Sequence, residues 1–134
     1  MTLTCDWVLV CEEAFFDPQR PQSLCLSRII EHAVVDTLPC TLGPFVIVAH
    51  LDGYGESVKV GLRATRPDGT FTVFSEDQLS FEHVGPYLLF TISRLEAPTE
   101  GRYRFDIVLD GVHVARTVSV AIMRVSHDVA GVVH

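Results

Sequence analysis

The sequence predicts an all-β protein, an antiparallel sandwich of seven to nine strands. Two observations lead to this prediction: apolar and polar residues alternate through most of the chain, and turn signals such as Asp110-Gly111 separate the alternating runs. A chain of 134 residues suits one domain, which can bury its own core without a disulfide or a metal. We therefore expect a single domain over residues 1–126 and a flexible C-terminal tail over residues 127–134.

The strand pattern recurs in about eight segments. They are expected over residues 3–11, 24–35, 45–51, 58–64, 71–74, 88–92, 103–109 and 112–122. The run over 45–51 has little polar content, which is typical of a central strand, whereas 58–64 alternates as a half-buried strand does. Arg116 falls at an inward position of the last segment, so we expect a β-bulge there.

Turn signals separate these segments. Asp110-Gly111 favours a type I′ hairpin turn, because both of its central residues need positive φ. Pro67-Asp68-Gly69 predicts a second hairpin turn, and residues 52–55 predict a third. Residues 17–21, with two prolines, are expected to form a loop without regular structure. One turn of helix is expected at most, around residues 76–79.

The spacing of Leu95, Thr99, Gly101, Tyr103 and Phe105 resembles the tyrosine corner of immunoglobulin-like domains. In such a corner a Leu ends one strand, a turn with Gly follows, and the Tyr hydroxyl bonds back to the backbone of that turn. Phe105 stands where antibody-type domains carry a Cys, so the resemblance implies an immunoglobulin-like sandwich without the disulfide. The alternative is a Tyr that merely alternates inward.

A longer stretch resembles a bacterial family of uncharacterised proteins, a domain of unknown function. It is "VLVCEEAFFDPQRPQSLCLSRIIEHAVVDTLP", followed by an apolar strand, a P-D-G hairpin and an E-G-x-Y-x-F ending. The family's "LxCDxA"-like strand end would correspond to residues 11–14, and its "SLxGxxxxI"-like strand would begin at Ser23-Leu24. Cys25-Leu26 stand where a Gly is usual. The resemblance implies an immunoglobulin-like sandwich over nearly the whole chain and no activity.

The amino-acid composition limits the classes of partner that the protein is expected to bind. The net charge of −7 and the pI near 5.2 argue against nucleic acid, because an acidic surface repels phosphate backbones. Nine Arg against one Lys indicate a GC-rich, bacterial genome. The amino terminus lacks the pattern of a secretory signal, and no apolar run approaches the ~18 residues of a membrane span. We expect a cytoplasmic protein without membrane contact.

The sequence carries no standard catalytic or nucleotide-binding motif, so we expect neither an enzyme nor a cofactor. The cysteines at positions 5, 11, 25 and 40 form no C-x-x-C pair and are expected to be free thiols. Cys40, beside Pro39, has no visible activation as a nucleophile.

Two groups of residues are candidate metal-ion or small-ligand sites. Glu12, Glu13 and Asp17 could supply oxygen ligands to a cation at a strand end, although solvated loop charges are the simpler interpretation. His50 and Asp52 could form a base with its orienting carboxylate, joined by His32 and His113 from other strands. The simpler interpretation of His50 is a solvated or hydrogen-bonded histidine.

Two surfaces are candidates for contact with a partner. Val46, Val48, Phe74 and Leu89 are expected to point away from a single core, where they are covered by the N-terminal strand or loops, or form a contact surface. Arg63, Arg102 and Arg104 are expected to face outward, as a basic patch for an acidic partner or as an ordinary charged face.

These observations predict a non-catalytic interaction or scaffolding module of a bacterial cytoplasm. Association would use an apolar sheet face or an edge strand, with a protein partner or a second copy. The alternative is a small-ligand or metal-ion binding domain that uses the acidic and histidine residues at the strand ends.

Overall fold

The structure is a computed structural model that describes residues 4–52, 59–74 and 79–125. These residues form twelve strands and no helix, which confirms the all-β prediction. No helix in this part of the chain is long and apolar enough to cross a membrane. The strands are β1 (Thr4–Asp17), β2 (Arg20–Ile29), β3 (His32–Val35), β4 (Cys40–Leu42), β5 (Phe45–Asp52), β6 (Val60–Thr65), β7 (Phe71–Val73), β8 (Leu79–Val84), β9 (Tyr87–Ile92), β10 (Leu95–Ala97), β11 (Gly101–Leu109) and β12 (His113–Arg124).

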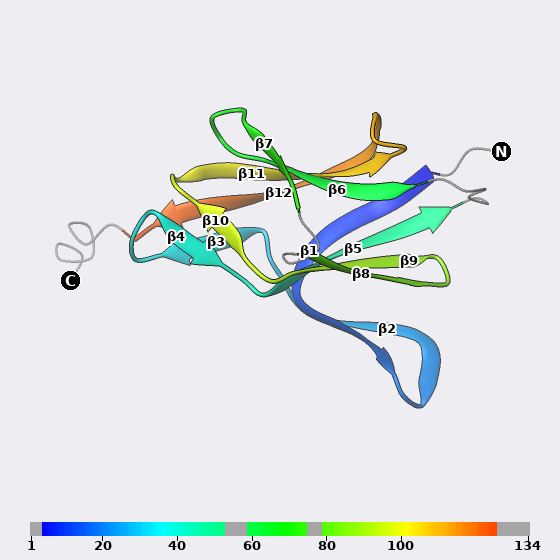
Figure 1. Cartoon of the computed structure of the whole chain (residues 1–134). Coiled ribbons are helices and arrows are strands. Elements are labelled where there is room, and N and C mark those ends of the chain that lie inside the picture. Colours follow the sequence, from blue (N-terminus) through cyan, green and yellow to red (C-terminus); the bar gives the residue numbers. More distant parts are fainter. Residues whose placement is uncertain (1–3, 53–58, 75–78, 126–134) are drawn as a thin grey trace.

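Two five-stranded sheets form the body of the molecule (Figure 1). The first sheet has the order β2-β1-β5-β9-β8, and the second has the order β3-β12-β11-β6-β7. A two-stranded sheet pairs β10 with β4. All described pairs are antiparallel except β3 with β12, which run parallel. Four of the described pairs join consecutive strands, and the other five join strands that are distant in sequence.

The two five-stranded sheets enclose a shared core. Alternation places Tyr103, Phe105 and Ile107 of β11 inward, where each is at most 1% exposed. They pack with side chains of the first sheet such as Ile47 and Phe90. Burial of each such side chain stabilises the fold by roughly 1.5–3 kcal/mol relative to leaving it exposed. This core accounts for the alternation of apolar and polar residues over 102–107.

Near the N-terminal end, the observed strands begin and end at other residues than predicted. The predicted segment over 24–35 is two strands, because the chain leaves the first sheet after Ile29 and β3 joins the second sheet beside β12. The prediction of an irregular loop over 17–21 was wrong. There β1 continues to Asp17 and β2 begins at Arg20, and the Asp17 carboxylate accepts a hydrogen bond from the backbone N–H of Gln19 at 2.9 Å.

Three short strands, β4, β8 and β10, were not predicted, and twelve strands stand against the seven to nine expected. The three-residue strands β4 and β10 are too short to show an alternating pattern. The predicted helical turn over 76–79 falls mostly outside the described residues, and its last residue, Leu79, begins β8. The predicted tail over 127–134 and the predicted turn residues 53–55 also lie outside them.

A second apolar cluster lies on the other face of the first sheet. Val46, Val48 and Leu89 are at most 7% exposed there, together with Cys11. Seven half-buried side chains cover them: Trp7, Leu9, Ala14, Phe16, Leu24, Leu26 and Tyr87. The N-terminal strand and the hairpin that follows it thus cover these residues, and the interpretation as an exposed contact surface was wrong. The placement of Phe74 was also wrong, since it lies in the shared core.

The turn at Tyr103 has the hydrogen bond that its spacing predicts. Tyr103 is fully buried, and its hydroxyl donates to the backbone carbonyl of Thr99 at 2.7 Å. At the other end of β11, Asp110 and Gly111 both have positive φ, 51° and 76°, and the Val112 N–H donates to the Leu109 carbonyl. This is the conformation that a type I′ turn requires.

We expect Tyr103→Phe to lower the free energy of unfolding by about 1 kcal/mol, because one intramolecular hydrogen bond is lost while the ring remains buried. Denaturant titration measures the change. Tyr87→Phe is the matched control, since Tyr87 is half-buried and in another sheet. Equal losses in the two variants would contradict a specific role for the Tyr103 hydroxyl.

Candidate functional site

The acidic residues predicted as a cation site have separate local roles. Glu12 lies 3.6 Å from the guanidinium of Arg28. Glu13 is opposite Ser27 in the pairing of β1 with β2, and Asp17 accepts the Gln19 N–H. Across the described ranges, no three His, Cys, Asp or Glu side chains gather to hold a metal ion. The structure therefore does not bring the predicted ligands together.

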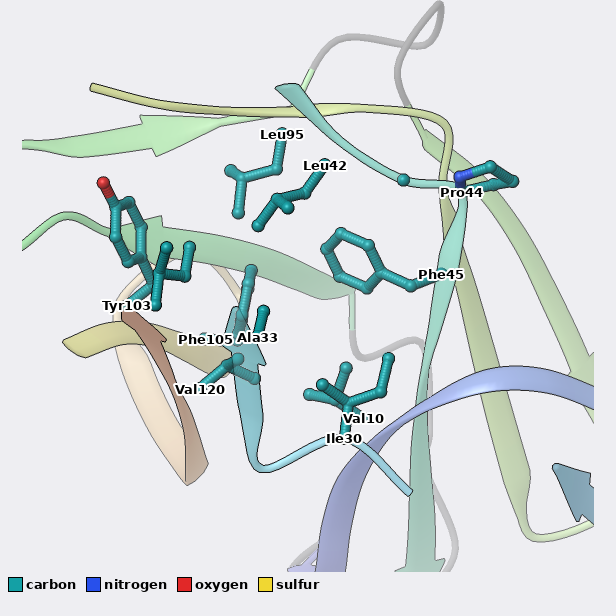
Figure 2. Close-up of a pocket in the computed structure, with 12 residues that line it drawn as sticks. Val10, Ile30, Ala33, Leu42, Pro44, Phe45, Leu95, Tyr103, Phe105 and Val120 are labelled. Carbon is teal, nitrogen blue, oxygen red and sulfur yellow. The ribbon is translucent and has the colours of Figure 1, made fainter. Parts of the chain in front are cut away.

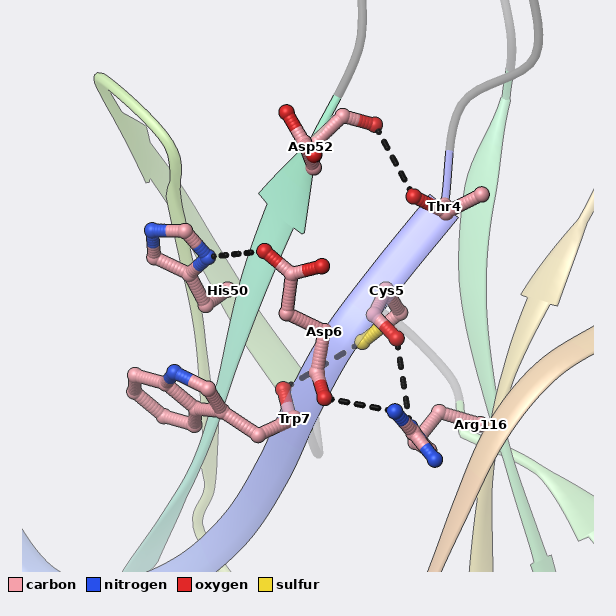
Figure 3. Close-up of polar contacts among 7 residues, drawn as sticks. All are labelled: Thr4, Cys5, Asp6, Trp7, His50, Asp52 and Arg116. Atoms are coloured by element: carbon pink, nitrogen blue, oxygen red, sulfur yellow. Dashed lines mark hydrogen bonds and ion pairs between the residues drawn. The ribbon is translucent and has the colours of Figure 1, made fainter.

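His50 pairs with Asp6 rather than with Asp52, so the predicted pair was wrong (Figure 3). The His50 Nδ1 and the Asp6 Oδ2 are 2.9 Å apart. The His50 ring stacks on Trp7, with centroids 5.6 Å apart and planes at 17°, and it meets Tyr87 edge-on. Asp52 contributes its backbone carbonyl, which accepts the Thr4 hydroxyl at 3.4 Å.

A bulge explains this change of partner. The pairing of β1 with β5 shifts between Cys5 and Trp7, which leaves Asp6 as the extra residue beside His50. Asp6 precedes His50 by 44 residues, and nothing in the local sequence indicates the register that joins them. The other predicted histidines, His32 and His113, lie on β3 and β12 of the second sheet.

Arg116 ties the two sheets together at the same place. Its Nε donates to the Cys5 carbonyl at 3.1 Å, and its Nη2 donates to the Asp6 carbonyl at 2.6 Å (Figure 3). The register of β12 also shifts here, because Ile107 is opposite Arg116 while Val108 is opposite Val114. The predicted bulge at Arg116 is therefore confirmed. Its guanidinium satisfies two carbonyls of the bulge in the facing sheet.

A buried carboxylate organises the outer face of the second sheet. Asp106 is 1% exposed and accepts bonds from Arg63 at 3.0 Å and Thr117 at 2.7 Å. The Arg104 Nε lies 3.3 Å from Asp106 Oδ1, the oxygen that also accepts the Thr117 hydroxyl, and the Arg63 guanidinium lies over the Phe71 ring. Two members of the predicted basic patch are thus partly neutralised by Asp106, whereas Arg102 is exposed and has no ion pair among the described residues.

An apolar cavity of about 140 Å³ opens between the two large sheets near β3 and β4 (Figure 2). Its walls include Val10, Phe45, Leu95 and Phe105. Tyr103 also lines the cavity. Its hydroxyl already donates a hydrogen bond to the Thr99 carbonyl, so this donor is not free for a ligand. The lining suits a small apolar group, since apolar cavities of this size remain dry and accept molecules such as benzene.

The sheets end in four edge strands of very different length. β3 and β7 have four and three residues and β8 has six, whereas β2 has ten. β2 pairs with β1 alone, and no described strand lies along its other side. The segment Gln22–Ser27 of this strand has neither charge nor proline, and Pro21 and Arg28 flank it. We call this segment the β2 edge.

No protein-family model matches the chain, and no curated protein is significantly similar to it.

We expect the four thiols to divide into two reactivity classes. Cys5 and Cys11 are buried, whereas Cys25 and Cys40 are partly exposed. Burial raises the pKa of Cys11 to about 11 and also raises the pKa of Cys5, so at pH 8 neither has much of the reactive thiolate. Iodoacetamide labelling of the folded protein, followed by peptide mass spectrometry, should modify Cys25 and Cys40 first. Equally rapid labelling of Cys11 would contradict the burial of this thiol.

Proposed function

We propose that the protein is a non-catalytic interaction module whose copies associate through the β2 edge. The observation that supports this most directly is a ten-residue edge strand with an uncharged, proline-free central segment. Exposed edges of this kind are templates for pairing with another strand, and natural proteins usually protect them with charges, prolines or short length. The other edges of the large sheets are shorter. The pairing of β2 with β1 is regular from Leu24 to Ile29, and a register shift between Phe16 and Asp17 lies beyond Leu24 on the Arg20 side.

A second copy is the occupant that fits the β2 edge by symmetry. Antiparallel pairing of a strand with itself forms a two-fold dimer in which the same patch is used twice. Leu24 and Leu26 point to the same face and are half-buried against the second apolar cluster. Pairing of Leu24 with Leu26 of the second copy keeps this face continuous across the dimer, and it places Cys25 directly opposite its own counterpart.

The pairing would extend the cover over the second apolar cluster. Leu24 and Leu26 remain partly exposed in the single chain, because no described strand lies beyond them. A strand added at this edge would remove more of their apolar surface from water, at roughly 25 cal/mol per Å². Main-chain hydrogen bonds and apolar burial thus favour the same contact.

We also propose that the two large sheets are an immunoglobulin-like sandwich and that the chain works in a bacterial cytoplasm. The Tyr103–Thr99 hydrogen bond supports the first part, because it occurs at the spacing of a tyrosine corner. The Arg-rich, Lys-poor composition supports a bacterial source, and the four free cysteines fit a reducing compartment. A scaffolding role follows from a domain that pairs its copies through a sheet edge.

We expect Cys25→Glu to dissociate the dimer, because it places two carboxylates directly opposite each other across the two-fold axis. Light scattering coupled to size-exclusion chromatography should give a dimer for the wild type and a monomer for this variant. Val34→Glu is the matched control: it adds the same charge to the short edge strand β3, where Val34 is 63% exposed, and should remain dimeric.

A chemical cross-link gives an independent readout. Residues directly opposite in an antiparallel pair have Cα atoms ~4.5–5.5 Å apart, which suits a disulfide. Mild oxidation should therefore produce a covalent dimer that Cys25→Ser abolishes and Cys40→Ser does not. A wild-type monomer at high concentration, or a dimer that survives Cys25→Glu, would overturn association at the β2 edge.

The apolar cavity favours a small apolar molecule as a second candidate ligand. If this is the function, benzene should raise the midpoint of thermal unfolding in a saturable way, because a ligand that binds only the folded state stabilises it. Ala33→Leu places a larger side chain on the cavity wall and should abolish the rise. A rise of equal size in both proteins would exclude this cavity as the binding site.

A further inference from the structure

The outer face of the second sheet carries a second candidate site, remote from the β2 edge in the fold. A depression of about 290 Å³ is lined there by three arginines, Arg66, Arg102 and Arg104, and by the hydroxyl residues Thr65 and Ser119. We call it the arginine depression. The chain has a net charge of −7, so three arginines around one depression are a local concentration of positive charge, although Arg104 shares the Asp106 carboxylate.

The sheet register builds the floor of this depression. Arg104 is opposite Thr65 of β6 on one side and Ser119 of β12 on the other. These three residues therefore form one row across neighbouring strands, and Arg104 has a hydroxyl residue on each side. Arg102 is two residues earlier on β11 and points to the same face. Ala121, opposite Arg102, leaves room beside it.

The third arginine, Arg66, comes from the β6–β7 turn, which lies close to the backbone of Gly101. Gly101 has φ of 135°, and a Cβ at this position would lie 2.7 Å from Pro67. The absence of a side chain thus lets the β6–β7 turn rest on the start of β11, which places Arg66 near Arg102. The turn itself is fixed, because the Asp68 carboxylate accepts bonds from the Thr70 N–H and hydroxyl at 2.8 and 2.6 Å.

The carboxylates near the depression already have partners. Asp106 lies buried between Arg63 and Arg104 and also accepts the Thr117 hydroxyl. Asp68 accepts two hydrogen bonds from Thr70, which lower the pKa of its carboxyl, and the nearby positive charge of Arg66 lowers this pKa further. In contrast, the side chain of Arg102 is exposed, and it forms no ion pair among the residues that the structure describes. Positive charge and hydrogen-bond donors at this place are therefore available to a ligand.

We propose that the arginine depression binds a phosphate monoester. A phosphoryl group carries about −1.5 to −2 charges near neutral pH and three strong acceptor oxygens, which matches several guanidinium forks flanked by hydroxyls. A carboxylate is planar and singly charged, so one arginine is enough for it. The group belongs either to a free phosphorylated metabolite or to a phosphorylated side chain of a partner protein, and its chemistry is the same in both.

Inorganic phosphate is the first probe. Amide chemical shifts of Arg102, Arg104 and Ser119 should move saturably on titration with phosphate at constant ionic strength, and chloride should not reproduce the shifts. Arg102→Gln should weaken phosphate binding about tenfold or more, because it removes the charge-assisted hydrogen bonds of one guanidinium. Arg66→Gln should weaken it similarly. Arg94→Gln, which removes an exposed arginine outside the depression, is the matched control.

The source of the phosphoryl group is resolved by comparing phosphoserine with a phosphoserine-containing peptide. Tighter binding of the peptide assigns the site to a phosphorylated partner, and equal binding assigns it to a small molecule. The proposal is overturned if the wild type shows no saturable shift, or if Arg94→Gln weakens binding as much as Arg102→Gln. The Cys25→Glu variant should bind phosphate normally, so failure of the β2 edge and failure of this site are distinguishable.

Discussion

The pairing of β1 with two different strands is the constraint on which the surface of this molecule depends. The first half of β1 pairs with β5, and the second half pairs with β2. Cys11 belongs to both registers, opposite Val46 on one side and Ile29 on the other, and its side chain is fully buried. A strand that ended at Cys11 would remove the cover that Phe16, Leu24 and Leu26 give to the cluster of Val46 and Val48. The additional residues of β1 and their hairpin partner β2 cover these side chains instead.

The same arrangement creates a free strand edge. A two-stranded hairpin is marginally stable by itself, so the β1–β2 hairpin depends on the apolar contacts of Phe16, Leu24 and Leu26 with the second cluster. These contacts fix one face of β2 and leave its outer backbone edge without a described neighbour. Apolar cover of the first sheet and a capacity for strand pairing thus arise from one structural feature. This physical link is why the edge is a better basis for function than the scattered polar residues.

The sequence was informative where structure depends on neighbours along the chain. Alternation identified the inward face of β11, and Asp110-Gly111 identified its turn, because both signals are local. The inward position of Arg116 correctly indicated a bulge for the same reason. The prolines at 18 and 21 were misleading: Pro18 lies in the hairpin turn, and Pro21 lies in an edge strand, where a missing N–H is tolerated.

Predictions that depended on register across distant strands were less successful. His50 was assigned to Asp52 because the two are close in sequence, yet a bulge in β1 brings Asp6 to it. Asp106 lies on the outward face of β11 and is nevertheless 1% exposed, because alternation gives the face of a residue but not what covers that face. The guanidinium groups of Arg63 and Arg104 and the Thr117 hydroxyl enclose it. The sequence could therefore indicate that three arginines face outward, but not which of them remain available.

The two proposed contact surfaces belong to different sheets, with the shared core between them. The β2 edge lies at one end of the first sheet, whereas the arginine depression lies on the outer face of the second. Occupation of one surface leaves the residues of the other free. A dimer formed through β2 would consequently carry two arginine depressions, related by the same two-fold axis. For a partner with two phosphoryl groups at a matching separation, the second contact becomes intramolecular, so pairing of copies would raise the affinity without any new residue in the site.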